Sequence, residues 1–138
     1  FRINLGGLFM NDKEKIQNLV KAYQKAIHSQ SKEDFIALWT CQNNNTLISL
    51  TNQFNGIESI YQDFLIGGIQ KNYSKINLIA ENIDIHFINE NIAIVVFQYH
   101  TECIKRETGE DYGIEGLETQ VVQQNDNQWK LVHIHYSK

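Results

Sequence analysis

The first part of the chain carries hydrophobic residues at the spacing of a helix. Apolar positions separated by three or four residues predict a helix that Asp12 caps and that runs to about His28, with one buried face. The members of this apolar stripe are Ile16, Leu19, Val20, Tyr23 and Ile27. The folded part of the sequence is therefore expected to begin with an amphipathic helix.

Two shorter helices are predicted next. Ser31 followed by Asp34 resembles a capping box, and the apolar residues after it indicate a second helix that ends near Cys41. A turn at Asn55-Gly56 precedes a third helix, which Gly67-Gly68 should weaken or stop. All three helices thus lie in the first half of the chain.

A period of two replaces the helical spacing in the second half. Residues 46–50 already have the composition of a short strand. From residue 76 onward, alternating apolar and polar residues predict longer strands over residues 76–88, 91–104, 115–124 and 128–137. Helices followed by a long antiparallel run predict an α+β domain, in which three N-terminal helices pack against a curved, mainly antiparallel sheet.

The last of these strands has an unusual polar pattern. Because side chains alternate along a strand, His133, His135 and Ser137 should share one face. The opposite face should be filled by Val132, Ile134 and Tyr136. Polar groups on a buried sheet cost free energy unless they have hydrogen-bond partners, so we expect this row to line a pocket or an interface.

Length and charge narrow the class of protein. The 138 residues suit one domain, expected over residues 10–138, and residues 1–9 are interpreted as a leader of vector or upstream origin, or as a segment that docks elsewhere. A net charge of −4 argues against nucleic acid or an anionic membrane as a partner. The two distant cysteines and the short apolar stretches indicate a reduced, cytoplasmic protein without membrane spans.

Four segments of the sequence together resemble a known superfamily. They are Phe54-Asn55-Gly56, Asp84-Ile85-His86-Phe87-Ile88, Glu118-Thr119 and the W-x-x-V-H-x-H-x-S string from Trp129 to Ser137. This set is similar to the SnoaL-like, ketosteroid-isomerase-like superfamily, also called nuclear transport factor 2-like. Within it, the pattern is similar to the association (hub) domain of calcium/calmodulin-dependent protein kinase II and its free-standing bacterial relatives. The resemblance implies a cone-shaped, cystatin-like fold, a deep pocket between sheet and helices, and homo-oligomers, dimers above all, built through the sheet.

The chain departs from these relatives at the positions that carry their chemistry. The kinase hub has arginines at the positions that match Tyr99 and Gln120, so carboxylate binding by arginine is not implied here. The steroid isomerase has a carboxylate base at the end of its first strand, where this chain has Ser49-Leu50-Thr51. Tyr23 does match the isomerase's oxyanion-binding tyrosine, and a phenol can donate to a developing enolate.

Pattern and resemblance together give a set of candidate pocket residues. They are Tyr23, Trp39, Tyr99, Glu118, Gln120, His133 and His135. Imidazole titrates near neutral pH and burial raises the pKa of an unpaired carboxyl, so His133 and Glu118 are candidate bases and Tyr23 a candidate donor. The alternative is that hydrogen bonds satisfy both histidines and that Glu118 pairs with one of them or is exposed.

A metal site is a further alternative. Two histidines two residues apart on a strand can share one ion. The additional ligands would come from His86, His100, Glu102 or Glu118. We expect no metal, and no cofactor either, because the glycine pairs lack the spacing of nucleotide-binding loops.

Two functions therefore stay open. The first is an oligomeric pocket domain that binds a small organic ligand or a partner protein without catalysis. The second is a small isomerase, dehydratase or lyase-type enzyme that acts on an apolar molecule by histidine or glutamate acid–base chemistry.

Overall fold

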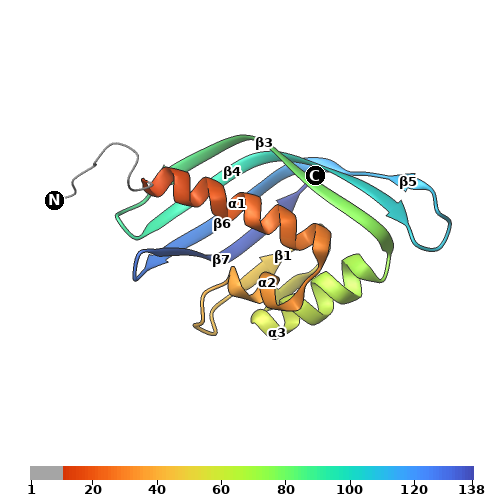
Figure 1. Cartoon of the computed structure of the whole chain (residues 1–138), viewed down its shortest axis with the longest axis horizontal. Helices are drawn as coiled ribbons and strands as arrows, with labels where there is room; N and C mark the ends of the chain where they lie inside the picture. The colour runs from red at the N-terminus through yellow and green to blue at the C-terminus, as the bar shows by residue number, and fades with distance from the viewer. Residues whose placement is uncertain (1–10) are drawn as a thin grey trace.

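The computed structural model describes residues 11–138, and the expected leader at residues 1–9 lies outside this part. A long helix, α1 (Asp12–Ser29), lies along the sheet that curves around it (Figure 1). Its predicted apolar stripe is buried against the sheet. Asn11, rather than the expected Asp12, caps the helix, because its side-chain oxygen accepts a hydrogen bond from the Glu14 amide at 2.8 Å.

The second helix is shorter than predicted. It spans α2 (Lys32–Ala37) and is capped by Ser31, whose hydroxyl accepts from the Asp34 amide at 3.3 Å. The third begins as α3 (Ile57–Ser59) and continues without a break as η1 (Ile60–Gln70), a π-helix. In η1 the turns are wide, as the hydrogen bond from the Lys71 amide to the Ile66 carbonyl, five residues earlier, shows.

Gly67-Gly68 do not stop this helix, which was one of the two effects predicted from the sequence. The helix runs through both glycines to Gln70, because the burial of Ile60, Phe64 and Leu65 outweighs the low helix propensity of glycine. A β-carbon on Gly67 would lie 3.2 Å from the Gln62 carbonyl oxygen, so the wide turn leaves little room for a side chain there.

Within residues 11–138 seven strands form a single, mainly antiparallel sheet, as the sequence predicts for the fold class. They are β1 (Thr46–Ile48), β2 (Gln53–Asn55), β3 (Tyr73–Phe87), β4 (Ile92–Lys105), β5 (Asp111–Tyr112), β6 (Glu115–Asn125) and β7 (Gln128–Ser137). The order is β2-β1-β7-β6-β4-β3, with β5 paired to β4 and β1 parallel to β7. The sequence did not predict β2 and β5, which are too short to show a period of two.

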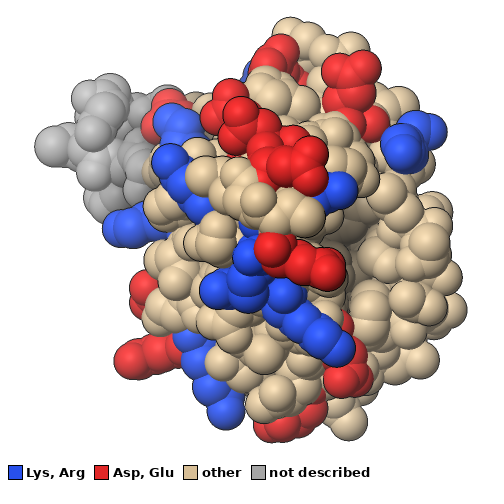
Figure 2. Space-filling model, turned by 90° about the vertical axis from the view of Figure 1, so that its right-hand side faces the viewer, with Lys and Arg blue, Asp and Glu red and all other residues tan. Residues whose placement is uncertain are grey.

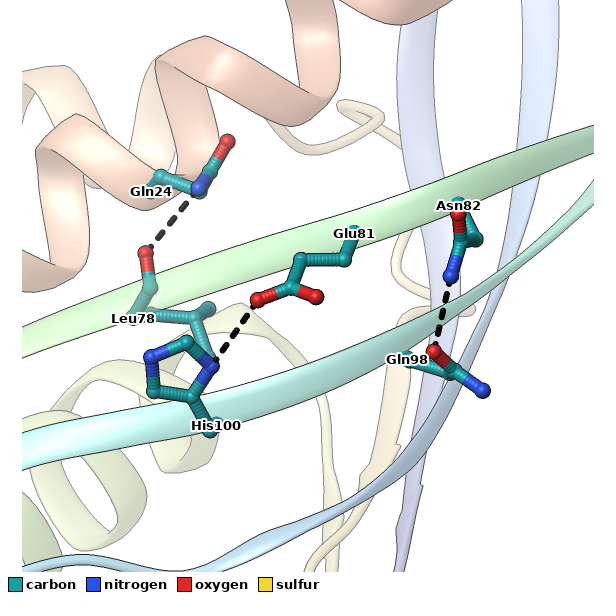
Figure 3. A network of polar contacts seen from close by, with 6 residues as sticks. All are labelled: Gln24, Leu78, Glu81, Asn82, Gln98 and His100. Atoms are coloured by element: carbon teal, nitrogen blue, oxygen red, sulfur yellow. Dashed lines mark hydrogen bonds and ion pairs between the residues drawn. The ribbon is translucent and has the colours of Figure 1, made fainter.

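A bulge bends β3 where it passes α1. The register between β3 and β4 shifts between Glu81 and Asp84, and Asn82 takes a left-handed φ of 54°. Asn82 donates to the Gln98 side chain at 2.8 Å, and Glu81 lies 3.3 Å from His100 (Figure 3). These contacts hold the bent strand against β4.

A second bulge reverses the facing of residues along β7. Val121 pairs with His133 while Val122 pairs with Leu131, so Val132 is the extra residue. Trp129 and Leu131 therefore share the buried face with Ile134. The prediction that Val132 fills this face with Ile134 is wrong, because the bulge shifts its phase and leaves it half-buried.

Candidate functional site

The polar row of β7 lies on the outer face of the sheet. Its residues alternate with Ile134 and Tyr136, which face the helices, and His135 and Ser137 are exposed. His133 is half-buried, with its Nδ1 2.6 Å from the Thr46 hydroxyl and its ring 6.3 Å from that of His135. Burial and then His135 lower the pKa of His133 below its usual 6.5, although a hydrogen bond with the Thr46 backbone raises it.

A cavity of about 500 Å³ lies on the other side of the sheet. It is bounded by η1, the loop at residues 49–52 and the inner faces of β3 and β4. Phe54, Phe64, Tyr73, Tyr99 and Tyr136 contribute aromatic rings to its wall. Of the expected pocket residues Tyr99 lines it, whereas His133 does not, and His135 borders a separate depression near the C-terminal residues.

Behind Tyr99 and Tyr136 lies a buried polar group that we call the tyrosine–glutamate cluster. It consists of Tyr23, Tyr99, Glu118, Gln120 and Tyr136. α1 supplies Tyr23, whose hydroxyl is 2.5 Å from that of Tyr136 on β7. Gln120 donates to Glu118 Oε2 at 2.7 Å, and the Tyr99 hydroxyl donates to the Ser137 carbonyl at 3.1 Å.

The sheet register explains why these side chains meet. Glu118 on β6 pairs with Tyr136 on β7 and with Phe97 on β4, so their side chains stand side by side on the inner face. Glu118 and Gln120 are both 0% exposed. The alternative in which Glu118 pairs with His133 or His135 is wrong because both histidines lie on the opposite face of the sheet. The alternative in which Glu118 lies in solvent is wrong because the residue is fully buried.

Burial controls the ionisation of the cluster. It raises the pKa of Glu118 from 4.5 to about 8, while Gln120 and then Tyr136 lower it by smaller amounts. Tyr136 lies close enough to have this effect, yet Glu118 Oε1 makes no hydrogen bond within the described residues. Burial and the nearby Glu118 also raise the pKa values of Tyr23 and Tyr136 well above 10.

The cluster can hold or transfer a proton next to the cavity. At neutral pH Glu118 is mostly protonated. Its neighbour Tyr136, whose hydroxyl contacts that of Tyr23, lines the cavity. A carboxyl with a pKa near the ambient pH suits acid–base work, and a phenol suits hydrogen bonding to a ligand oxygen. Glu118 itself does not line the cavity, so Tyr136 is the group that a ligand would touch.

The remaining expected pocket residues have different positions. Tyr23, Glu118 and Gln120 lie behind the cavity wall, and Trp39 is in the core, with its ring 6.0 Å from that of Phe35. Sequence reasoning missed Tyr136, which was assigned to core filling. Its alternation with His135 placed it on the inner face, but only its pairing with Glu118 across the strands shows its role.

Within residues 11–138, neither possible metal ligands nor thiols indicate a second functional site. Residues 11–138 contain no group of three or more histidine, cysteine, aspartate or glutamate side chains that could hold a metal ion. Cys103 is a free thiol in the cavity wall, and Cys41 is exposed. No helix in this part of the chain is long and apolar enough to cross a membrane.

Solved structures show that this architecture is the nuclear transport factor 2-like fold. A superfamily protein from Salmonella enterica serovar Typhimurium superposes with a TM-score of 0.85 at 24% identity, over 91% of this chain and 89% of that one. Hexachlorocyclohexane dehydrochlorinase LinA-type3 from Novosphingobium barchaimii gives 0.80 at 12% identity, over 91% and 84%. A provisionally described kinase II association domain from Xanthomonas campestris gives 0.77 at 14% identity, over 93% and 88%.

The family within this fold follows from the sequence match. Residues 12–138 match the calcium/calmodulin dependent protein kinase II association domain family, and the chain belongs to it. The suspected resemblance is thereby confirmed. The comparison with curated proteins finds no match.

Proposed function

We propose that this protein is an oligomeric binding domain whose cavity takes a small, mainly apolar organic ligand. The cavity carries this proposal: about 500 Å³ is within the range of ligand sites, and its wall combines aromatic rings with a few hydroxyl groups. Tyr99 and Tyr136 are among the polar residues of this wall. A core filled by side chains would instead have favoured an assembly domain without a ligand.

Ligand binding can be tested by narrowing the cavity. Gly68 lines it, and a β-carbon there would meet only the Asp63 carbonyl at an ordinary 3.5 Å, so Gly68→Leu should fold and place its side chain at the wall. Small aromatic compounds should shift the NMR signals of cavity residues in the wild type and not in this variant. Thr108→Leu, on an exposed loop, is the control and should respond as the wild type does. Gly109→Leu on the same loop is unsuitable because φ is +75° there. Equal shifts in all three proteins would place the ligand elsewhere.

The outer face of the sheet is the surface we propose for dimerisation. Ile94, Val96 and Val121 are half-buried there, and Leu117 is 49% exposed beside them, so the face carries an apolar stripe. Membership of the association-domain family supports self-assembly. A second copy of the chain is therefore the occupant we assign to this face.

Light scattering after size-exclusion chromatography tests this assignment. The wild type should elute with twice the monomer mass of 16.1 kDa, and Leu117→Lys should return it to the monomer, because a charge in the apolar stripe resists burial. Ile88→Lys, at a position 59% exposed in the β3–β4 turn, is the matched control and should stay dimeric. A monomeric wild type at micromolar concentration would refute the dimer.

The second candidate function is a small isomerase, dehydratase or lyase-type enzyme. The specific observation in its favour is the tyrosine–glutamate cluster, in which the pKa of Glu118 is about 8 and Tyr136 reaches the cavity. In this candidate Tyr136 donates its proton to a substrate oxygen and takes one from Glu118, while water takes the hydrogen from the neighbouring carbon; the reverse steps restore the carbonyl compound. His133 has no part in it, since it does not line the cavity.

Deuterium exchange provides a direct test of the enzyme candidate. Small cyclic ketones in deuterated buffer should exchange the hydrogen next to the carbonyl faster with the wild type than with buffer alone. Glu118→Gln should abolish the acceleration, while Glu115→Gln, an exposed position on the same strand, should keep it. Exchange at the buffer rate with the wild type would rule out this chemistry for ketones.

A further inference from the structure

The cavity wall has an unbalanced set of polar groups. None of the described residues that line it is lysine, arginine or histidine, whereas Asp63 contributes a carboxylate on η1. Asp63 accepts one hydrogen bond, from the Ser59 hydroxyl at 2.9 Å. The charge that a ligand meets within the wall is therefore negative.

Aromatic rings add to this negative character. Phe64 and Tyr136 stack with centroids 5.9 Å apart, and Tyr99 meets Tyr136 edge-on at 5.4 Å. Phe54 lies 5.8 Å from Phe64, so four rings form a continuous part of the wall. The face of an aromatic ring attracts cations within about 6 Å of its centroid.

Two buried oxygen atoms without hydrogen-bond partners in the described residues lie behind the cavity wall. Glu118 Oε1 and Gln120 Oε1 are fully buried and lack hydrogen-bond partners within residues 11–138. Both attract positive charge, Glu118 most strongly once it ionises as the pH rises through about 8, and Glu118 acts electrostatically on Tyr99 and Tyr136 in the wall. Within residues 11–138 neither oxygen atom therefore has a positive partner.

Two basic side chains close to the β4–β5 hairpin are engaged elsewhere. Arg106 donates to the Gln70 and Tyr73 carbonyls at 2.9 and 3.0 Å, and the Lys105 ammonium lies 4.8 Å above the Tyr112 ring. Figure 2 shows basic and acidic side chains side by side on the end of the molecule that carries the β4–β5 hairpin. These cations stabilise the hairpin and do not enter the cavity wall.

We propose that the cavity selects organic cations, in particular compact ammonium compounds with an apolar or aromatic body. Asp63 would attract the ammonium group and the ring faces would surround it, with the Glu118 carboxyl behind them. This inference rests on the proposed ligand-binding function and specifies the chemical class of the ligand.

Three probes of nearly equal size separate charge from shape. They are phenyltrimethylammonium, its uncharged carbon isostere tert-butylbenzene, and benzoate. Titration followed by NMR should give a dissociation constant about tenfold lower for the cation than for the isostere, and no saturation with benzoate. Equal or tighter binding of tert-butylbenzene or benzoate would overturn the selectivity and leave ligand binding intact. No binding of any probe up to about 10 mM would overturn both.

Replacing Asp63 tests whether its carboxylate selects the charge of the ligand. Asp63→Asn should weaken phenyltrimethylammonium binding several-fold and leave tert-butylbenzene unchanged, because only a charge is lost. Asp126→Asn, in the distant β6–β7 turn, is the matched control and should leave both constants unchanged. A loss for both probes in Asp63→Asn would mean that the residue shapes the cavity and does not select charge.

The pH dependence tests the contribution of Glu118. The titratable groups around it are Tyr23, Tyr99 and Tyr136, whose pKa values are all raised, so between about pH 6 and pH 9 Glu118 is the group that changes charge. Affinity for the cation should rise over this range and become flat in Glu118→Gln. A rise that persists in this variant would remove Glu118 from the selection.

Discussion

Replacing Glu118 with glutamine should stabilise the protein, and increasingly so as the pH rises. In the folded protein burial raises the pKa of Glu118 from 4.5 to about 8, so the folded state holds a proton that the unfolded state loses above pH 4.5. Stability from this group is therefore fully present below 4.5 and is lost as the pH rises through about 8. Glutamine keeps the shape and the hydrogen-bonding capacity but does not ionise.

The size of the effect follows from the pKa difference. One unit corresponds to about 1.4 kcal/mol, so the rise from 4.5 to about 8 amounts to about 5 kcal/mol when the pH is well above 8. At pH 7 most of this loss, about 3 kcal/mol, is already present. Relaxation of the buried site would reduce both values.

Urea unfolding of both proteins at a series of pH values from 5 to 9 measures this difference. The free energy of unfolding of Glu118→Gln minus that of the wild type should grow by about 1.4 kcal/mol per pH unit up to about pH 8 and then level off. Glu115→Gln, exposed on the same strand, should give parallel curves. A constant difference for Glu118→Gln across the series would refute the raised pKa.

Three further changes probe the same region and the outer face. Tyr23→Phe should cost about 1 to 3 kcal/mol in urea unfolding, because it removes the hydroxyl that pairs with Tyr136 in a fully buried place, and no cost would refute that pairing. Thr46→Val should leave the pKa of His133 below 6.5 in an NMR titration, because burial lowers it most and the Thr46 backbone, which raises it, is kept; a value of 6.5 or higher would contradict this. Trp39→Phe should cost little beyond the lost contact area, because the Trp39 Nε1 has no partner within the described residues, and a cost above about 4 kcal/mol would contradict this.

The sequence was sufficient for the elements with a clear period. The stripe of α1 and the alternation of β3, β4, β6 and β7 are long enough to reveal the type of each element, and they give the α+β class directly. The short strands β2 and β5 and the π-helical form of η1 depend on tertiary pairing and packing, so no local pattern predicts them.

The site was harder to predict because one residue changes the facing of a strand. The row of His133, His135 and Ser137 was correctly placed on one face, yet the sequence does not show that this face is the outer one. The sequence suggested Glu118 as buried, and the structure adds that its neighbour is Tyr136 and not a histidine. Such cross-strand neighbours depend on register, which a bulge alters without a mark in the sequence.

The energetic cost of Glu118 connects stability to function. A loss of about 3 kcal/mol at neutral pH is a large share of the 5 to 15 kcal/mol by which a domain of this size is stable. Glutamine would fit the same space and avoid that cost, so stability alone does not account for a glutamate here. Groups that violate local rules of stability occur mainly where their chemistry is used. Glu118 lies directly behind Tyr99 and Tyr136 of the cavity wall. The cost of keeping a glutamate there therefore favours the cavity, and not the histidine row of β7, as the functional site.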